Sequence, residues 1–105
     1  MLLVTTDLIY GKDISQSLGM VKGEIVQSKH VGKDFMAGMK TIVGGEIKSY
    51  TEMISDARNI ATERMIAEAE KIGADAIVGV RYGSSGVMQG AAEMIAYGTA
   101  VKLKK

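Results

Sequence analysis

The chain contains no cysteine and no proline, and it has one histidine, His30, and one phenylalanine. The absence of cysteine excludes disulfides and thiolate metal sites. Without proline, turns depend on glycine and small polar residues, and 13 glycines are available for them. Charge of either sign is not in excess, because 13 Lys and Arg residues face 12 Asp and Glu residues. We therefore expect neither a nucleic-acid nor a membrane partner.

Long hydrophobic runs are also missing. No segment approaches the length of a membrane span. Met1 to Tyr10 lacks a basic start, has too short an apolar run and contains Asp7, so it does not resemble a signal peptide. We expect a cytoplasmic protein with one domain, residues 1–105. The hydrophobic fraction of 47% is high for so small a monomer, which suggests that part of the apolar surface serves subunit contacts.

The stretch Ser49 to Lys71 predicts one long amphipathic helix. Ser49 and Glu52 form a capping-box pattern at its start, and Gly73 suits the position just after its end. Arg58 and Glu63 fall on other faces than the apolar residues. The apolar face recurs at steps of three and four residues and comprises Tyr50, Ile54, Ala57, Ala61, Met65, Ala69 and Ile72.

A shorter helix is predicted upstream. Asp34 is a suitable N-cap, and Gly44-Gly45 would end the helix. The residues of its broad apolar face are Phe35, Met36, Met39, Ile42 and Val43.

The remaining apolar segments predict four strands, at Leu2 to Thr6, Ile14 to Ser28, Ala76 to Tyr82 and Glu93 to Leu103. In the second strand the alternation slips near Val21 to Gly23, where Gly23 would suit a β-bulge. Gly83 to Gly90 is polar and rich in glycine, so we expect a mobile connection there rather than a tight hairpin.

The last predicted strand is apolar on both faces. One parity gives Ile95, Tyr97, Thr99, Val101 and Leu103, and the other gives Met94, Ala96, Gly98 and Ala100. One helix cannot bury both faces, and no other predicted element is long enough to cover the second. We therefore expect a homo-oligomer in which neighbouring copies cover it. The alternative is that the short helix near Phe35 folds over that face.

Several motifs together resemble one family. They are Val21-Lys22-Gly23-Glu24, Asp34 to Lys40, Ile42-Val43-Gly44-Gly45, Ser49-Tyr50, Ala57-Arg58, Gly73 to Val80 and Gly98 to Val101. In this order they resemble the YbjQ-like family, also called UPF0145 or "putative heavy-metal-binding". The resemblance implies an α+β, two-layer, dodecin-like or YbjQ-like subunit, with a long helix packed on an antiparallel sheet, that assembles as a ring of five. Members have no settled biochemical activity.

The family name directs attention to metal ligands. Soft metals prefer thiolate, thioether or imidazole, and the chain offers only His30 and methionines. Symmetry in a ring could gather copies of His30 or Glu24 around an axis, and Met36 and Met39 could supply thioethers. The alternatives are a surface histidine and core methionines. In the family, acidic residues often follow the Gly-Val of the penultimate strand, but here Arg81-Tyr82-Gly83 follows Gly79-Val80, which weakens an acidic cation site at this point.

An anion or small-ligand site is a second hypothesis. Gly44 and Gly45 precede the long helix, and Lys40 and Lys48 flank them, so accessible amides and positive charge would favour an anion. Glu46 opposes this, no phosphate-binding motif is present, and the glycines could simply form a turn.

Catalysis has weak support. Ser84, Ser85, His30 and Asp75 could be combined into a triad by count, but no nucleophile-elbow pattern surrounds either serine. Asp75 is more typical of a turn residue that bonds nearby amides. We therefore predict a binding module rather than an enzyme, with a purely structural ring as the alternative.

Overall fold

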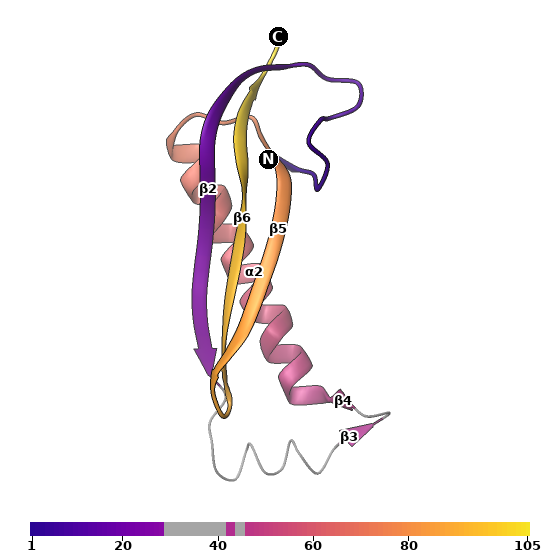
Figure 1. Cartoon of the computed structure of the whole chain (residues 1–105), viewed down its shortest axis with the longest axis vertical. Helices are drawn as coiled ribbons and strands as arrows, with labels where there is room; N and C mark the ends of the chain where they lie inside the picture. Colours follow the sequence, from indigo (N-terminus) through magenta and orange to yellow (C-terminus); the bar gives the residue numbers. More distant parts are fainter. Residues whose placement is uncertain (29–41, 44–45) are drawn as a thin grey trace.

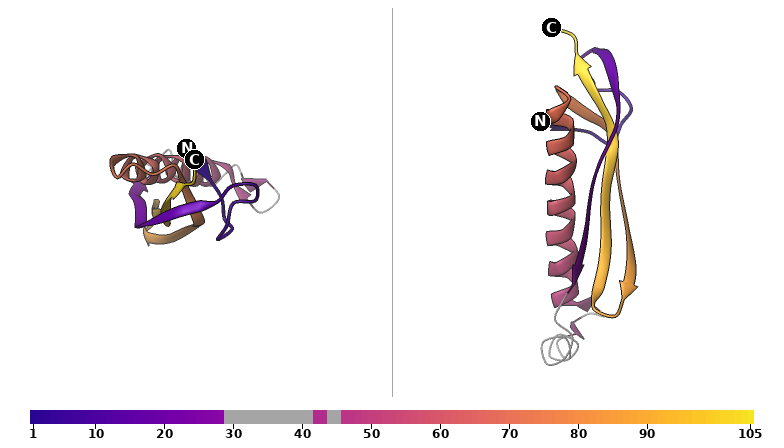
Figure 2. Two further views of the ribbon diagram at one scale, coloured as in Figure 1. Left: turned by 90° about the horizontal axis from the view of Figure 1, so that it is seen from above. Right: turned by 90° about the vertical axis from the view of Figure 1, so that its left-hand side faces the viewer.

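The computed structural model describes the backbone of residues 1–28, 42–43 and 46–105, and the side chains of residues 1–28 and 50–105. Within these ranges one helix lies against one face of a sheet, as Figures 1 and 2 show. The elements are β1 (Leu2–Leu3), β2 (Ile14–Ser28), β3 (Ile42–Val43), β4 (Glu46–Ile47), α2 (Lys48–Lys71), β5 (Ala76–Met88) and β6 (Ala91–Leu103).

The main sheet has four strands in the order β1-β5-β6-β2. β6 pairs antiparallel with both β5 and β2, but β1 pairs parallel with β5. The α+β class is confirmed, whereas the expectation of a purely antiparallel sheet is wrong. The first strand is also shorter than predicted, since only Leu2 and Leu3 belong to it.

β5 and β6 form a tight hairpin. The polar segment from Gly83 onward continues β5 to Met88, and Gln89 and Gly90 make the turn. Gly83 pairs with Ile95 and Ser84 with Met94, so the apolar strand β6 holds this stretch extended despite its low strand propensity. The expectation of a loop at Gly83 to Gly90 is therefore wrong.

β2 has the predicted limits, but its irregularities lie elsewhere. The register with β6 shifts between Ile14 and Gln16 and between Ser17 and Gly19, where Gly19 has a φ of 109°. At Gly23 the pairing is regular, and the predicted bulge there is wrong. Gly23 instead lies under the helix, because a Cβ at this position would overlap backbone atoms of Ala61 and Met65.

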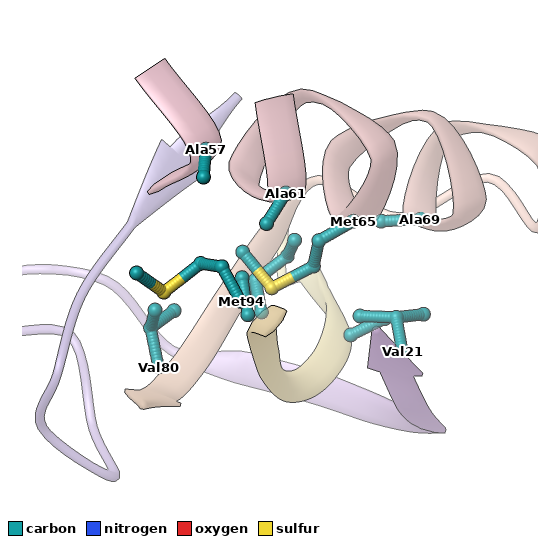
Figure 3. Close-up of a cluster of buried hydrophobic side chains, with 10 residues drawn as sticks. Val21, Ala57, Ala61, Met65, Ala69, Val80 and Met94 are labelled. Carbon is teal, nitrogen blue, oxygen red and sulfur yellow. The ribbon is translucent and has the colours of Figure 1, made fainter. Parts of the chain in front are cut away.

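α2 begins one residue before the predicted Ser49 and ends at Lys71 as predicted. Its buried face is confirmed at Ala57, Ala61, Met65 and Ala69 (Figure 3), and Met53, which the prediction did not include, is buried as well. Ile72 is 46% exposed, so its assignment to this face is wrong. Gly73 has a φ of 79°, and the bonds from Gly73 N to Glu70 O (3.1 Å) and from Ala74 N to Ala69 O (3.0 Å) complete a Schellman motif.

The segment before α2 is not helical at Ile42 and Val43. These residues form β3, which pairs antiparallel with Glu46 and Ile47 of β4. The predicted short helix is therefore wrong at this end. Its other residues, from Asp34 to Met39, lie outside the described residues, as does the alternative that it covers the second sheet face.

The two faces of the sheet differ in their cover. The helix face packs on α2 and contains Val21, Ile77, Met94, Ala96 and Ala100. On the opposite face, which we call the open face, Ile9 and Val4 pack on Ala76, Val78 and Val101. The N-terminal segment thus covers one end of the open face, and the expectation that no other part of the chain could do so is wrong for that end.

Backbone bonds hold the N-terminal segment along β5. Val4 N donates to Ile77 O (3.0 Å), and Gly79 N donates to Thr6 O (2.8 Å). The Arg81 guanidinium adds a bond to Thr5 O of 2.8 Å. Together these contacts extend the short parallel pairing of β1 and explain why this segment can act as a cover.

Candidate functional site

A groove runs between the C-terminal half of α2 and β2. It has a volume of about 550 Å³. The helix lies close to the strand because Gly23 has no side chain, and the helix and β2 then diverge toward the end of the sheet that carries the chain termini (Figure 2). The groove is lined by Met20, Val21, Lys22, Gly23, Glu24, Arg64, Ala67, Glu68 and Lys71.

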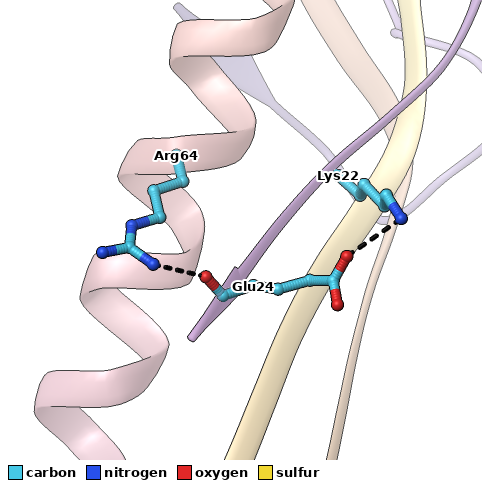
Figure 4. A network of polar contacts seen from close by, with 3 residues as sticks. All are labelled: Lys22, Glu24 and Arg64. Atoms are coloured by element: carbon cyan, nitrogen blue, oxygen red, sulfur yellow. Dashed lines mark hydrogen bonds and ion pairs between the residues drawn. The ribbon is translucent and has the colours of Figure 1, made fainter. Parts of the chain in front are cut away.

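Glu24 joins the two walls of this groove (Figure 4). Arg64 Nη1 donates to the backbone O of Glu24 at 2.6 Å, which ties the helix to the strand. The Glu24 carboxylate pairs with Lys22 Nζ at 2.9 Å, and this contact raises the pKa of Lys22 above its ordinary value. Because both Lys22 and Glu24 are largely exposed, the pair contributes little to stability.

The rest of the open face mixes charged and apolar side chains. Lys22 and Arg81 are both paired with Tyr97, one on each side of it, and Glu24 is paired with Ile95. Met20 is 76% exposed, Val26 is 64% exposed and Tyr97 is 39% exposed. The prediction that neither face is polar is therefore only half correct, since β6 is apolar here whereas β2 has the charged Lys22 and Glu24 between Met20 and Val26.

Of the four predicted metal ligands, only Glu24 lies among the described residues. Its carboxylate is on the open face, and within residues 1–28 and 50–105 no three His, Asp or Glu side chains form a group that could hold a metal ion. His30, Met36 and Met39 lie outside the described residues, so the metal hypothesis stays a prediction.

The predicted anion site is described only at its edge. Lys48 is the first residue of α2, and Gly44 and Gly45 lie outside the described residues, as does the side chain of Lys48. The nearby Glu46 belongs to β4. This hypothesis too stays a prediction.

The structure separates the residues of the possible triad. Asp75 precedes β5, and its Oδ2 accepts a hydrogen bond from Leu103 N at 2.9 Å. Ser84 lies eight residues after the start of β5, which places it roughly 25 Å from Asp75 at the usual rise of a strand. Asp75 therefore binds an amide, as the sequence suggested, but it joins the end of β6 rather than capping its own turn.

Sequence reasoning missed Arg64 and the Lys22–Glu24 pair. Two residues apart in a strand share one face, so the spacing of Lys22 and Glu24 could have revealed that pair. Arg64 is 40 positions away from Glu24, and only the crossing of helix and strand brings them together.

A family model described as "Putative heavy-metal-binding", YbjQ, matches residues 1–104 of the chain. The chain belongs to the YbjQ family. Among similar proteins, UPF0145 proteins from Thermosipho africanus and Pseudothermotoga lettingae are 66% and 64% identical to it over 105 residues. The alignments cover 100% of this chain and 97% and 99% of those proteins. The resemblance inferred from the motifs is thus confirmed.

A solved structure supports the fold of this YbjQ-family chain. It is a protein of unknown function from Pediococcus pentosaceus that belongs to the DUF74 family. The two chains superpose with a TM-score of 0.64 over 99% of this chain and 98% of the other, at 16% identity. At that identity the likeness concerns the fold alone. Within the described residues, no helix is both long and apolar enough to cross a membrane.

Proposed function

We propose that the protein forms a homo-oligomeric ring in the cytoplasm and serves there as a binding module for a metal ion or another small ligand. The observation that carries this proposal is the composition of the open face. Exposed Met20, Val26 and Tyr97 give it an apolar surface of the kind that protein contacts use, and Lys22 and Glu24 stand among them. A ring of five is the size that the family resemblance implies.

Glu24 is the described residue best suited to a cation. Its Oε1 pairs with Lys22, and a carboxylate can accept further contacts through its second oxygen. One carboxylate cannot form a closed metal site alone, but rotational symmetry would repeat it in every copy around a common axis. Carboxylate oxygens suit harder cations, whereas the predicted His30 would extend the range to zinc, copper and nickel.

A structural ring without a small ligand is the second candidate. It is favoured by the same exposed apolar residues, because these need a protein partner and not an ion. Native mass spectrometry and elemental analysis of untagged protein distinguish the two. We expect an oligomer that carries an ion or small molecule at fixed stoichiometry. Bare rings would favour the structural role, and a monomer at micromolar concentration would contradict both.

Replacing Glu24 with glutamine should weaken metal binding at least about 10-fold, or about 1.4 kcal/mol. The substitution keeps the shape of the side chain and removes the negative charge that a cation needs. Calorimetric titration with zinc, nickel and copper at neutral pH measures the effect. Glu63→Gln is the matched control, since Glu63 is exposed on α2 away from the sheet. Equal affinity in the wild type and Glu24→Gln would exclude Glu24 as a ligand.

A further inference from the structure

At both long edges of the sheet, some backbone N–H and C=O groups have no hydrogen-bond partner in any described strand. β2 is the last strand at one edge. At the other edge, β1 pairs with Ala76 and Ile77, and Val4 O accepts the last bond of the N-terminal segment from Val80 N. From Tyr82 to Met88, β5 therefore has no neighbour on its outer side among the described residues.

The direction of each hydrogen-bonding group in β6 follows from one contact. Asp75 N donates to Val101 O at 2.9 Å, so the backbone groups of Val101 point toward β5. Successive residues of a strand point alternately to the two sides, and β6 runs without an inserted residue. The groups of Ile95 and Tyr97 therefore also point toward β5, and those of Ala96 and Gly98 point toward β2.

The outward groups of β2 can be assigned in the same way. Val21 and Gly23 lie opposite Gly98 and Ala96 and exchange bonds with them. The residues between them turn their N–H and C=O groups away from the sheet, and these are Met20, Lys22, Glu24 and Val26. The bond from Arg64 Nη1 to Glu24 O supports this assignment independently, because it requires that this carbonyl face outward.

The outward groups of β5 belong to residues of the opposite parity. Arg81 and Gly83 lie opposite Tyr97 and Ile95 and bond to them. The outward residues are Tyr82, Ser84 and Gly86. Their side-chain positions are on the helix face, as the contact of 2.9 Å between the Tyr82 and Thr62 hydroxyls confirms for Tyr82. The outward residues of β2, in contrast, carry their side chains on the open face.

We infer that β2 of one copy pairs in parallel with β5 of a second copy, residues 20–26 against 82–86. This inference rests on the homo-oligomer proposed above and specifies the strands through which its copies pair, which we call the joint. In a parallel pair the bonding residues of the two strands carry their side chains on opposite faces, and in an antiparallel pair on the same face. Only the parallel arrangement therefore joins these two edges and keeps all helices on one side of the extended sheet.

The head-to-tail joint also accounts for both edges. Each copy would give its β5 edge to one neighbour and its β2 edge to the other, and a closed ring would leave neither edge exposed. The helix crosses the sheet diagonally (Figure 1), so equivalent helices of neighbouring copies can lie side by side. The exposed Tyr82 and Val87 on the β5 edge would gain contacts in this joint.

A two-fold pairing of β2 with β2 is the main competitor. It fits the parity of the bonds, because two open-face residues can pair antiparallel. However, an isologous two-fold contact closes at two copies and cannot build the ring proposed above. It would also leave both β5 edges unpaired.

Amide hydrogen exchange of the wild-type protein tests the joint without any substitution. We expect the amides of Lys22, Val26, Tyr82 and Ser84 to exchange on the order of 100-fold more slowly than unprotected amides. Unprotected amides in a protein of oligomeric mass would overturn the joint and leave the proposed function standing. A monomeric mass would overturn both.

Proline substitutions test the two edges separately. Lys22→Pro and Ser84→Pro each remove an outward N–H that no described strand of the same copy pairs, as edge strands tolerate. We expect both to reduce the protein to folded monomers, with dissociation constants raised at least about 100-fold, and Lys22→Ala and Ser84→Ala to keep the wild-type mass. Circular dichroism verifies that each variant is folded. If a variant does not fold, amide hydrogen exchange of the wild-type protein tests the joint instead. Loss of assembly in Lys22→Pro alone would indicate the two-fold joint instead, and wild-type mass in both would refute the parallel joint.

Discussion

Replacing Gly23 with alanine is expected to lower the free energy of unfolding by about 3 kcal/mol, the upper end of the usual cost of overpacking. The new methyl group would overlap the backbone O of Ala61 and the backbone N of Met65. Backbone atoms of a helix cannot move out of the way one at a time, so α2 as a whole must shift from β2. The shift would also lengthen the contact between Arg64 and Glu24 that closes the groove.

Urea denaturation at one fixed protein concentration measures this effect, and the melting temperature should fall by roughly 12–24 °C. Gly86→Ala is the matched control, because Gly86 lies in β5 of the same sheet and no atom is within 4 Å of an added Cβ. The control should be neutral or slightly stabilising, since alanine restricts the unfolded chain. If both substitutions had the same small effect, the close approach of helix and strand would be refuted.

Gly23 also shows where prediction from sequence ends. The helix could be predicted because its apolar period and its final glycine agree, and β2 because its apolar residues keep the parity of a strand as far as Met20. From the sequence alone, Gly23 in β2 predicts a bulge. Glycine within a strand is expected both at a bulge and where a distant helix approaches closely, so the sequence does not distinguish the two. The bond from Arg64 to Glu24 depends on that approach and could not be predicted before it.

The prediction for the second half of β5 was wrong for a different reason. Gly83, Ser84 and Ser85 have low intrinsic strand preference, and local composition indicated a loop. Pairing with the apolar strand β6 decides the conformation, and a partner strand is a non-local property. Because a loop was expected there, the outer edge of β5, on which the inferred joint depends, was not predicted either. The Lys22–Glu24 pair, in contrast, was missed although its spacing alone could have revealed it.

Replacing Met65 with alanine is expected to cost about 3 kcal/mol, within the usual range for buried methionine. The side chain of Met65 projects from α2 onto the sheet and is fully buried. Its neighbours on the helix, Ala61 and Ala69, have side chains too small to fill the space that its removal would leave (Figure 3). The cavity would therefore persist and add its own cost to the lost burial.

The volume-conserving variant Met65→Leu separates packing from any other role of the thioether. It should lose less than about 1.5 kcal/mol, because leucine fills nearly the same space. Met88→Ala is the control for loss of a methionine as such, since Met88 is 72% exposed, and it should change stability by less than about 0.5 kcal/mol. Urea denaturation of Met65→Ala, Met65→Leu and Met88→Ala measures the loss in the free energy of unfolding for each variant. A loss in Met65→Leu as large as that in Met65→Ala would contradict this account, because leucine would then fill the space no better than alanine does.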